Sequence, residues 1–148
     1  MTHATSSRTS STKRLPASEL QSCIEACHAC ADACEYCATS CLAEPEVSHM
    51  RRCIQLDRDC ADLCRLAAAM LSRDSEFADS VCRLCAELCD ACGQECSAHA
   101  ADHCQRCATA CRRCADACRV MAQTICTTGA TRPGATPHED KARGAAHH

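Results

Sequence analysis

Six cysteines in the first third of the chain recur with a spacing that places them on one face of a helix. They are separated by alternating steps of four and three residues, and they are Cys23, Cys27, Cys30, Cys34, Cys37 and Cys41. Residues three and four apart are neighbours on a helix surface, so the spacing predicts a continuous stripe of thiols. In a heptad pattern such a stripe is usually leucine and faces a partner helix. The pattern therefore predicts a helix that turns its thiols toward the inside of a bundle.

Three further segments carry the same pattern, and residues 46–71, 75–99 and 102–124 are each predicted to be helical. Their inward-facing positions are Met50, Cys53, Asp57, Cys60, Cys64, Ala67 and Leu71, then Ala78, Cys82, Cys85, Cys89, Cys92, Cys96 and His99, and finally Cys104, Cys107, Cys111, Cys114, Cys118 and Met121. Four helices of similar length joined by short turns predict an all-α, antiparallel up-down-up-down four-helix bundle with a cysteine-lined core. Nineteen of the 20 cysteines follow this register, and only Cys126 departs from it.

Local signals set the expected limits of the bundle. Ser18 with Gln21 resembles a capping box at the start of the first helix, and Pro45 suits the first turn of the second. Residues 72–75 read as a short turn that ends in good N-cap residues. Gly93 interrupts the third helix at a cost of about 1 kcal/mol relative to alanine, which is acceptable where two helices must approach closely.

These limits predict one domain over residues 18–126. Residues 1–17, which are polar and rich in Ser and Thr, are expected to form a flexible N-terminal tail. Residues 127–148, which hold three of the four glycines, are expected to form a flexible C-terminal tail. The terminal His147 and His148 can be native or added, so no role is predicted for them.

Composition narrows the possible functions. The chain has one Tyr, one Phe and no Trp, so an ordinary apolar core is thin and something else must fill the interior. The net charge of −3 is spread over both signs and gives no basic surface for nucleic acid. No apolar run reaches the roughly 20 residues of a membrane span, and no secretory or twin-arginine signal is found. We therefore expect a cytoplasmic protein, in which thiols stay reduced and dense cysteine indicates metal binding.

The ligand type favours copper(I). Thiolates are soft ligands that select copper(I), zinc or iron–sulfur clusters. Structural zinc uses closed sets of four ligands, whereas the helical spacing gives an unbroken ladder, and iron–sulfur proteins carry their cysteines in loops. Copper(I) accepts two or three thiolates in variable geometry, so the sequence predicts many Cu(I) ions per chain. A zinc or other soft-metal buffer is the alternative.

Three other interpretations compete with metal storage. Cysteine can be a small buried hydrophobe, but nineteen in register would fill a core less well than leucine. Disulfides are disfavoured by the compartment and by the poor orientation of neighbours on one helix. A thiol redox enzyme would need one activated cysteine, for which Cys104 beside His103 is the best candidate. We expect a binding protein and no enzyme.

The two ends of the predicted bundle differ. One end gathers polar residues and thiols, so we expect ions to enter there and His99 and His103 to be metal ligands. The roles of His49 and Met50 at this end are left open, and Asp57, among the thiols, is predicted to bind metal or to accept hydrogen bonds from thiols. His28 is expected to face solvent. The other end is an apolar plug made of Leu20, Ala67, Leu71, Ala78, Met121 and Ile125.

From Ser18 to Met121 the chain resembles the cytosolic, cysteine-rich four-helix-bundle copper storage proteins. The segments that carry the resemblance are CIEACHACADACEYCATSC, CRLCAELCDACGQEC and HCQRCATACRRCADAC. The resemblance implies copper(I) bound in the bundle lumen by the cysteines of the four seams, uptake at a mouth formed by His99 and His103, and a homotetramer. The second helix departs from the pattern because it carries only three cysteines, so fewer sites are expected along it.

Overall fold

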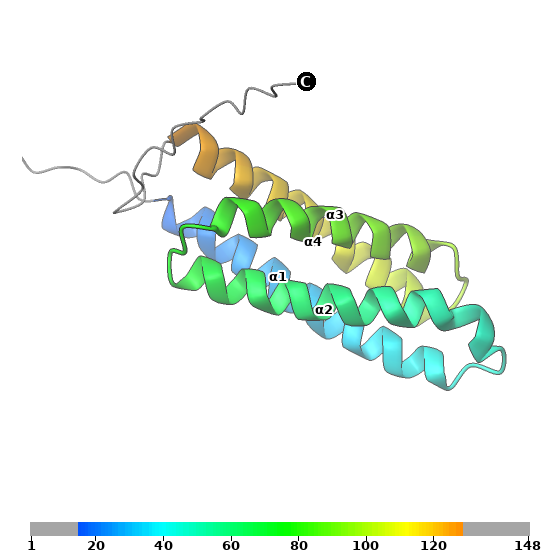
Figure 1. The fold of residues 1–148 in the computed structure, drawn as a ribbon. Helices are drawn as coiled ribbons and strands as arrows, with labels where there is room; N and C mark the ends of the chain where they lie inside the picture. Colours follow the sequence, from blue (N-terminus) through cyan, green and yellow to red (C-terminus); the bar gives the residue numbers. More distant parts are fainter. Residues whose placement is uncertain (1–14, 129–148) are drawn as a thin grey trace, which may run out of the picture.

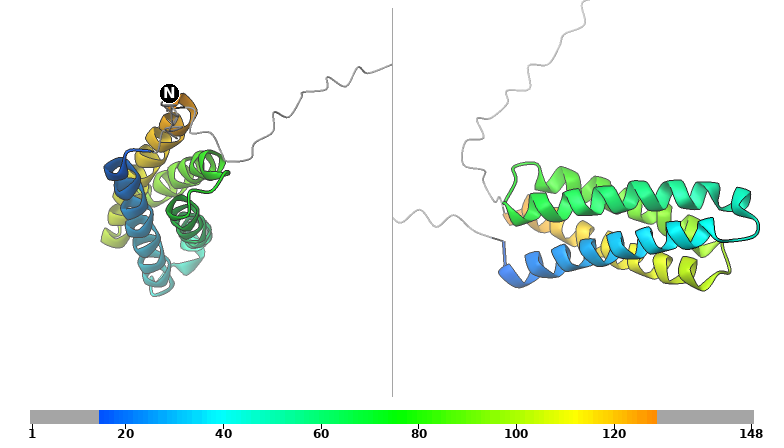
Figure 2. Two further views of the ribbon diagram at one scale, coloured as in Figure 1. Left: turned by 90° about the vertical axis from the view of Figure 1, so that its left-hand side faces the viewer. Right: turned by 90° about the horizontal axis from the view of Figure 1, so that it is seen from below.

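Helices account for most of the residues, 15–128, that the structure describes (Figure 1). In this computed structural model they are α1 (Ala17–Leu42), a short 3-10 helix η1 (Val47–Met50), α2 (Arg51–Ser72), α3 (Ala78–Ser97) and α4 (Asp102–Thr128). Each α-helix packs against the next in sequence, and α4 packs against α1, which closes a ring of four that Figure 2 shows from one end. The predicted up-down-up-down bundle is confirmed.

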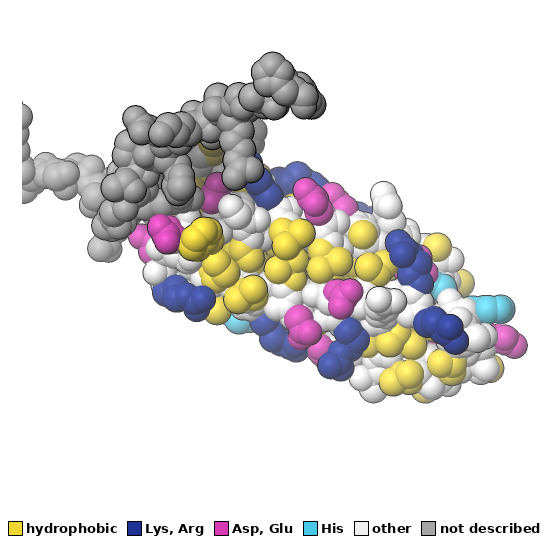
Figure 3. All heavy atoms as spheres, viewed as in Figure 1, with side chains coloured by type: hydrophobic (Ala, Val, Ile, Leu, Met, Phe, Trp, Pro, Cys, Tyr) yellow, Lys and Arg dark blue, Asp and Glu magenta, His cyan; other side chains and the backbone are white. Residues whose placement is uncertain are grey.

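The connections fall at opposite ends of the bundle. The α1–α2 and α3–α4 connections lie at one end, and the α2–α3 connection lies at the other, together with the start of α1 and the end of α4 (Figure 1). We call the first end the mouth. Histidine side chains are visible on the surface at this end in Figure 3. The predicted tails lie outside the described residues over 1–14 and 129–148, while α4 continues to Thr128, two residues into the segment expected to be a tail.

The capping box predicted at Ser18 is wrong. Helix α1 begins one residue earlier, with Pro16 at the N-cap position and without a hydrogen bond from a capping side chain. Ser18 therefore lies inside the first turn, where its hydroxyl is not in a capping position. The Gln21 side chain donates instead to Glu25, one turn further along the helix, at 3.0 Å.

Two other helix starts lie later than predicted. The second helix is a 3-10 turn up to Met50 before it becomes regular at Arg51. The third helix starts at Ala78 rather than at residue 75, because the chain turns at Asp74, whose φ of 54° lies in the left-handed region. Ser75 Oγ then accepts a hydrogen bond from the Phe77 amide at 3.2 Å, which holds the turn.

A second row of small residues runs beside the thiols. Each member follows an inward-facing position, recurs every seven residues along its helix and is buried; the row consists of Ala31, Ala38, Ala61, Ala68, Ala86, Gly93, Ala108, Ala115 and Ala122. Small side chains at helix contacts let backbones approach closely. We call this row the small-residue row. It sets the spacing of the helices around the thiols.

Gly93 shows how tight this spacing is. A Cβ at this position would lie 3.3 Å from Cys111 Cβ and 3.6 Å from the Ala108 carbonyl oxygen on α4. We predict that Gly93→Val destabilises the reduced, metal-free protein by about 1–3 kcal/mol, because the added methyl groups force α3 away from α4. Denaturant unfolding measures the change. Gln94→Val, on the exposed side of α3, is the control, and an equal loss in both variants would contradict close packing at Gly93.

The apolar plug is confirmed at the end opposite the mouth. Leu71, Ala67, Ala78 and Met121 are buried there, and Leu20 and Ile125 pack against the core. Leu71 and Met121 are also the largest fully buried side chains of the described residues, so cysteine and alanine fill most of the remaining interior. Within residues 15–128, none of the helices combines the length and apolar character that a membrane span requires.

Candidate metal centre

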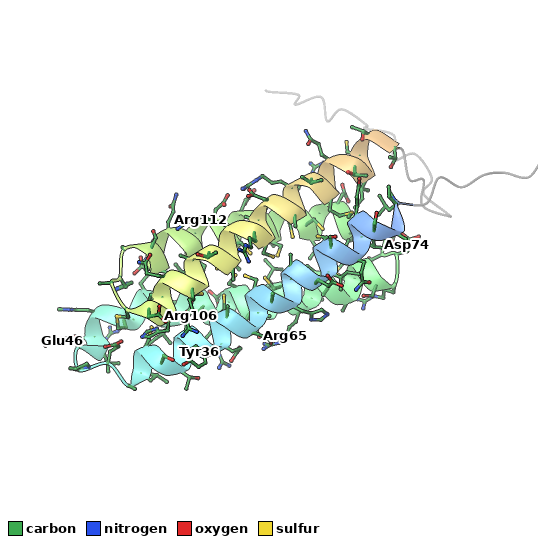
Figure 4. All side chains as sticks on the ribbon, turned by 180° about the vertical axis from the view of Figure 1, so that it is seen from behind. Tyr36, Glu46, Arg65, Asp74, Arg106 and Arg112 are labelled. Atoms are coloured by element: carbon green, nitrogen blue, oxygen red, sulfur yellow. The ribbon has the colours of Figure 1, made fainter. Side chains whose placement is uncertain are left out.

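The nineteen cysteines predicted to face inward line the axis of the bundle. Each is at most 1% exposed, and each is a free thiol. Figure 4 shows sulfur atoms between the helices along the length of the bundle. Cys126, which was predicted to lie off the register, is exposed. The heptad spacing therefore identified every buried thiol, because side chains on one helical face share one environment.

Sulfur atoms approach each other across the lumen as well as along each helix. Cys30 Sγ on α1 lies 3.9 Å from Cys89 Sγ on α3, and Cys64 Sγ on α2 lies 3.8 Å from Cys114 Sγ on α4. These pairs join helices that are diagonal in the ring. The four thiol stripes therefore meet in a single lumen.

The thiols form sets of four whose Sγ atoms all lie within 4.8 Å of one another. Four such sets share no member; they are Cys27, Cys85, Cys114 and Cys118; Cys30, Cys60, Cys64 and Cys89; Cys34, Cys92, Cys107 and Cys111; and Cys37, Cys41, Cys53 and Cys104. A fifth set, Cys30, Cys34, Cys60 and Cys111, overlaps two of these. Since one sulfur takes part in several sets, neighbouring ions can share ligands.

Asp57 lies at the junction of two parts of the lumen and is completely buried. Its Oδ1 accepts hydrogen bonds from Cys92, Cys96 and Cys107, at 3.2, 3.3 and 3.3 Å, and its Oδ2 accepts one from Cys53 at 3.7 Å. Cys53 and Cys96 lie toward the mouth, whereas Cys92 and Cys107 belong to the set that includes Cys34, and Cys107 Sγ lies 3.6 Å from Cys34 Sγ. Among the two predicted roles, the structure places Asp57 as an acceptor for thiols.

Burial decides the charge of Asp57 in the metal-free protein. Removal from water, with a further contribution from Cys107, raises the pKa of this carboxyl to about 8. The neutral acid is therefore the dominant form at pH 7. A neutral acid can be buried among thiols without the cost of an isolated charge.

At the mouth, His103 faces three thiols. Its Nδ1 lies 3.5 Å from Cys104 Sγ, 3.6 Å from Cys37 Sγ and 3.9 Å from Cys41 Sγ. On the other side of the ring, Nε2 lies 2.8 Å from Glu44 Oε1. A carboxylate accepts the Nε2 hydrogen, which leaves the Nδ1 lone pair directed at the sulfurs, as in carboxylate–histidine–metal arrangements.

Burial also affects the thiols of the mouth. It raises the pKa of Cys104 to about 11, and it raises the pKa of Cys41 as well. Both thiols are thus protonated at neutral pH in the metal-free protein. A metal ion must displace these protons when it binds.

The other polar residues near the mouth are placed differently from His103. His99 Nε2 lies 3.2 Å from Glu95 Oε1, and in the described residues His99 has no hydrogen bond to a sulfur. The structure therefore does not bring His99 together with the thiols, although it lies near them at the end of α3. His49 is exposed on η1 and Met50 is buried in the core. His28 is exposed, as predicted.

Sequence reasoning missed the two carboxylates that hold the mouth histidines. Glu95 could have been found, because it lies four residues before His99 on one helix face. Glu44 could not, because it lies in the α1–α2 connection and reaches His103 only through the fold. Arg52 on α2 also contacts Glu95, at 3.1 Å, so the mouth is bordered by an ion pair.

We predict that Glu44→Ala slows copper(I) loading by about 10-fold while leaving the final capacity unchanged, because His103 loses the carboxylate that orients it. Glu44→Gln retains a hydrogen-bond acceptor and is expected to restore part of the rate. Stopped-flow mixing with a chromophoric copper(I) complex measures the rate. Glu46→Ala, an exposed carboxylate of the same connection, is the control (Figure 4). Equal rates in all four proteins would contradict a role for Glu44.

The fold and the lumen together define a four-helix bundle built to bind soft metal ions. The family model described as "Copper storage protein" matches residues 16–123. The chain belongs to the copper storage protein family. No relative is found among curated protein sequences.

Solved structures of copper storage proteins are also similar to this chain. The chain is 52% identical to the metal-free copper storage protein 3 of Bacillus subtilis, over 69% of this chain and 97% of that one, with a TM-score of 0.66. It is 51% identical to copper(I)-bound BsCsp3, over 70% and 98%, with a TM-score of 0.68. It is 43% identical to a cytosolic copper storage protein of Streptomyces lividans containing five coppers, over 72% and 93%, with a TM-score of 0.70.

Proposed function

We propose that this chain stores copper(I) ions along its lumen, bound by the nineteen buried thiols. The observation that carries this proposal is that all of these thiols are free and buried in one shared interior, and that sixteen of them form sets of four. The family stores copper and is not a family of enzymes. Storage requires only that many ions be held and later released.

The chemistry follows from the ligands. Each copper(I) ion replaces a thiol proton and binds two or three thiolates, and each thiolate bridges neighbouring ions. With bridging, the capacity is on the order of one ion per thiol. Because a proton and a copper(I) ion carry the same charge, filling leaves the net charge of the lumen unchanged. The lumen can therefore fill along its whole length without collecting buried charge.

We propose that ions enter at the mouth, where His103 and the thiols of Cys37, Cys41 and Cys104 form the outermost site. The imidazole nitrogen is a ligand that copper also accepts, and the sulfurs beyond it take the ion by exchange. The opposite end is closed by the apolar plug, in which the described residues place no histidine against the thiols and Met121 is buried in the core. Asp57 then lies on the route from the mouth thiols to the inner thiols. His99 is proposed to act as an outer ligand before His103.

Anaerobic titration of the reduced protein with copper(I), in the presence of a chromophoric competitor, tests the storage function. We expect more than ten ions per chain to bind before the competitor takes up copper, by the estimate of about one ion per thiol. Saturation at one or two ions would overturn storage. Cys126→Ser, which removes the exposed thiol, is expected to retain the full capacity.

We also propose a homotetramer in the cytosol. Leu66 on α2 and Leu84 on α3 are exposed, and Figure 3 shows apolar side chains along the face over these helices, a surface that can bury against other copies. The similar protein from S. lividans is described as cytosolic. Light scattering of the full chain should give four copies, and Leu66→Glu with Leu84→Glu should dissociate them. Cell fractionation tests the compartment.

A further inference from the structure

Four thiols at the middle of the bundle have the dimensions of a tetrahedral site. They are Cys30 on α1, Cys60 and Cys64 on α2, and Cys89 on α3, and we call them the central quartet. Five of the six Sγ–Sγ distances lie between 3.6 and 3.9 Å, and all six are below 4.8 Å. All four side chains are at most 1% exposed. Helical spacing alone does not reveal this closed set, because its members come from three helices.

The size of the quartet matches a particular class of ion. In a regular tetrahedron with metal–sulfur bonds of about 2.3 Å, as zinc forms, the sulfurs are about 3.8 Å apart. We propose that the central quartet binds one divalent tetrahedral ion of the zinc type. This site is distinct from copper storage in ion, charge and stoichiometry, although it uses thiols of the same lumen.

The central quartet suits a divalent ion better than the other sets do. None of its four sulfurs contacts Asp57, whereas Cys53, Cys92 and Cys107 of the other sets do. The set made of Cys27, Cys85, Cys114 and Cys118 has fewer close sulfur pairs, at 3.7 and 3.8 Å. The set of Cys30, Cys34, Cys60 and Cys111 also lacks a contact with Asp57, but only four of its edges are close, at 3.7 to 4.0 Å. Of the five sets described above, the central quartet has the most close edges, and it is free of the carboxylate.

Charge limits the number of such ions. Four thiols that lose their protons to one divalent ion leave a centre with two negative charges. No Lys or Arg side chain is buried anywhere in residues 15–128 to balance them. A second centre would add repulsion in a poorly solvated interior, so we expect one divalent ion per chain. Copper(I) should displace this ion, since one copper per thiolate leaves no excess charge.

Anaerobic titration of the reduced full chain with cobalt(II) alone tests the proposal, because cobalt adopts the zinc geometry and its absorption reports the number of thiolate ligands. The expected result is one ion per chain with a tetrathiolate spectrum, which zinc then bleaches by displacement. Cys60→Ser and Cys89→Ser should each abolish that spectrum. Cys23→Ser, which removes an equally buried thiol outside the quartet, should keep it.

Three results would overturn the proposal: no tetrathiolate spectrum in the wild-type chain, the same spectrum in both quartet variants, or several cobalt ions bound with equal affinity. Far-UV circular dichroism confirms that each variant is folded. Copper(I) titration of the same proteins separates this site from storage, since loss of one thiol should lower copper capacity by only one or two ions. A chain that stores copper and ignores cobalt would refute the quartet site alone.

Discussion

Filling the lumen with copper(I) is expected to raise the melting temperature of the protein by more than about 20 °C. The metal-free interior is mostly thiols and alanines, and within residues 15–128 only Leu71 and Met121 are large apolar side chains that are fully buried. An ion at 1,000 times its Kd stabilises the folded state by about 4 kcal/mol. For a domain of this size, 1 kcal/mol shifts the melting temperature by about 4 °C or more. A few bound ions are therefore sufficient to raise the melting temperature by this amount.

Thermal unfolding of the reduced protein, followed by circular dichroism with increasing copper(I), measures this shift. The melting temperature should increase steadily with the number of ions bound, because the thiols of each set of four come from two or more helices. Cys126→Ser should give the same curve as the wild type. A shift of only a few degrees at full loading would mean that copper binds equally well to the unfolded chain, which a preformed lumen does not allow.

The second large effect is expected from replacing a set of four thiols in the middle of the lumen. Changing Cys30, Cys34, Cys60 and Cys111 to serine should lower the copper(I) capacity by at least four ions, by the estimate of about one ion per thiol. At short loading times the loss should be larger, because these four thiols lie between the mouth and the thiols beside the apolar plug. Cys30 alone contacts the sulfurs of the other three at 3.7 to 4.0 Å.

Timed anaerobic titrations distinguish the two parts of this effect. Rapid loading should stop once the mouth thiols are filled, and slower loading should follow. Cys30→Ser alone, which disturbs the fold less, should remove one or two ions. If the four-fold variant were folded and kept the wild-type capacity, the buried thiols would not be the ligands.

The heptad spacing of cysteine predicted the fold and the buried thiols because both depend on one periodicity. Thiols at helical spacing share one face of each helix, and packing the four faces together buries them. The short connections then make helices that follow one another in sequence neighbours in the ring. The start of α1 was less predictable. Ser18 is a residue type that is favoured at N-cap positions, but Pro16 occupies the N-cap position of α1. Local propensity alone does not choose between the two starts.

The mouth was only partly predictable, because its contacts form where the helices meet the connections. His103 follows the end of the α3–α4 connection and meets Glu44 from the α1–α2 connection, a pairing with no sequence signal. His99 lies in register with the thiols of α3, but the helix ends at Ser97 and its ring contacts Glu95 instead. Helix phase ceases to predict direction once the helix has ended.

In this bundle, the residues that set the helix spacing, which form the small-residue row, are different from the residues that face the lumen. Ala31, Ala61, Gly93 and their equivalents fix how closely the helices approach, and none of them offers a ligand atom. The heptad position just before each of them supplies the side chains, mostly thiols, that face the lumen. Asp57 on α2, and Met50 on η1 just before it, occupy positions where the other helices mostly carry thiols, and α2 still packs in the ring. The number of thiols in such a chain can therefore change by substitution while the small-residue row keeps the width of the lumen the same.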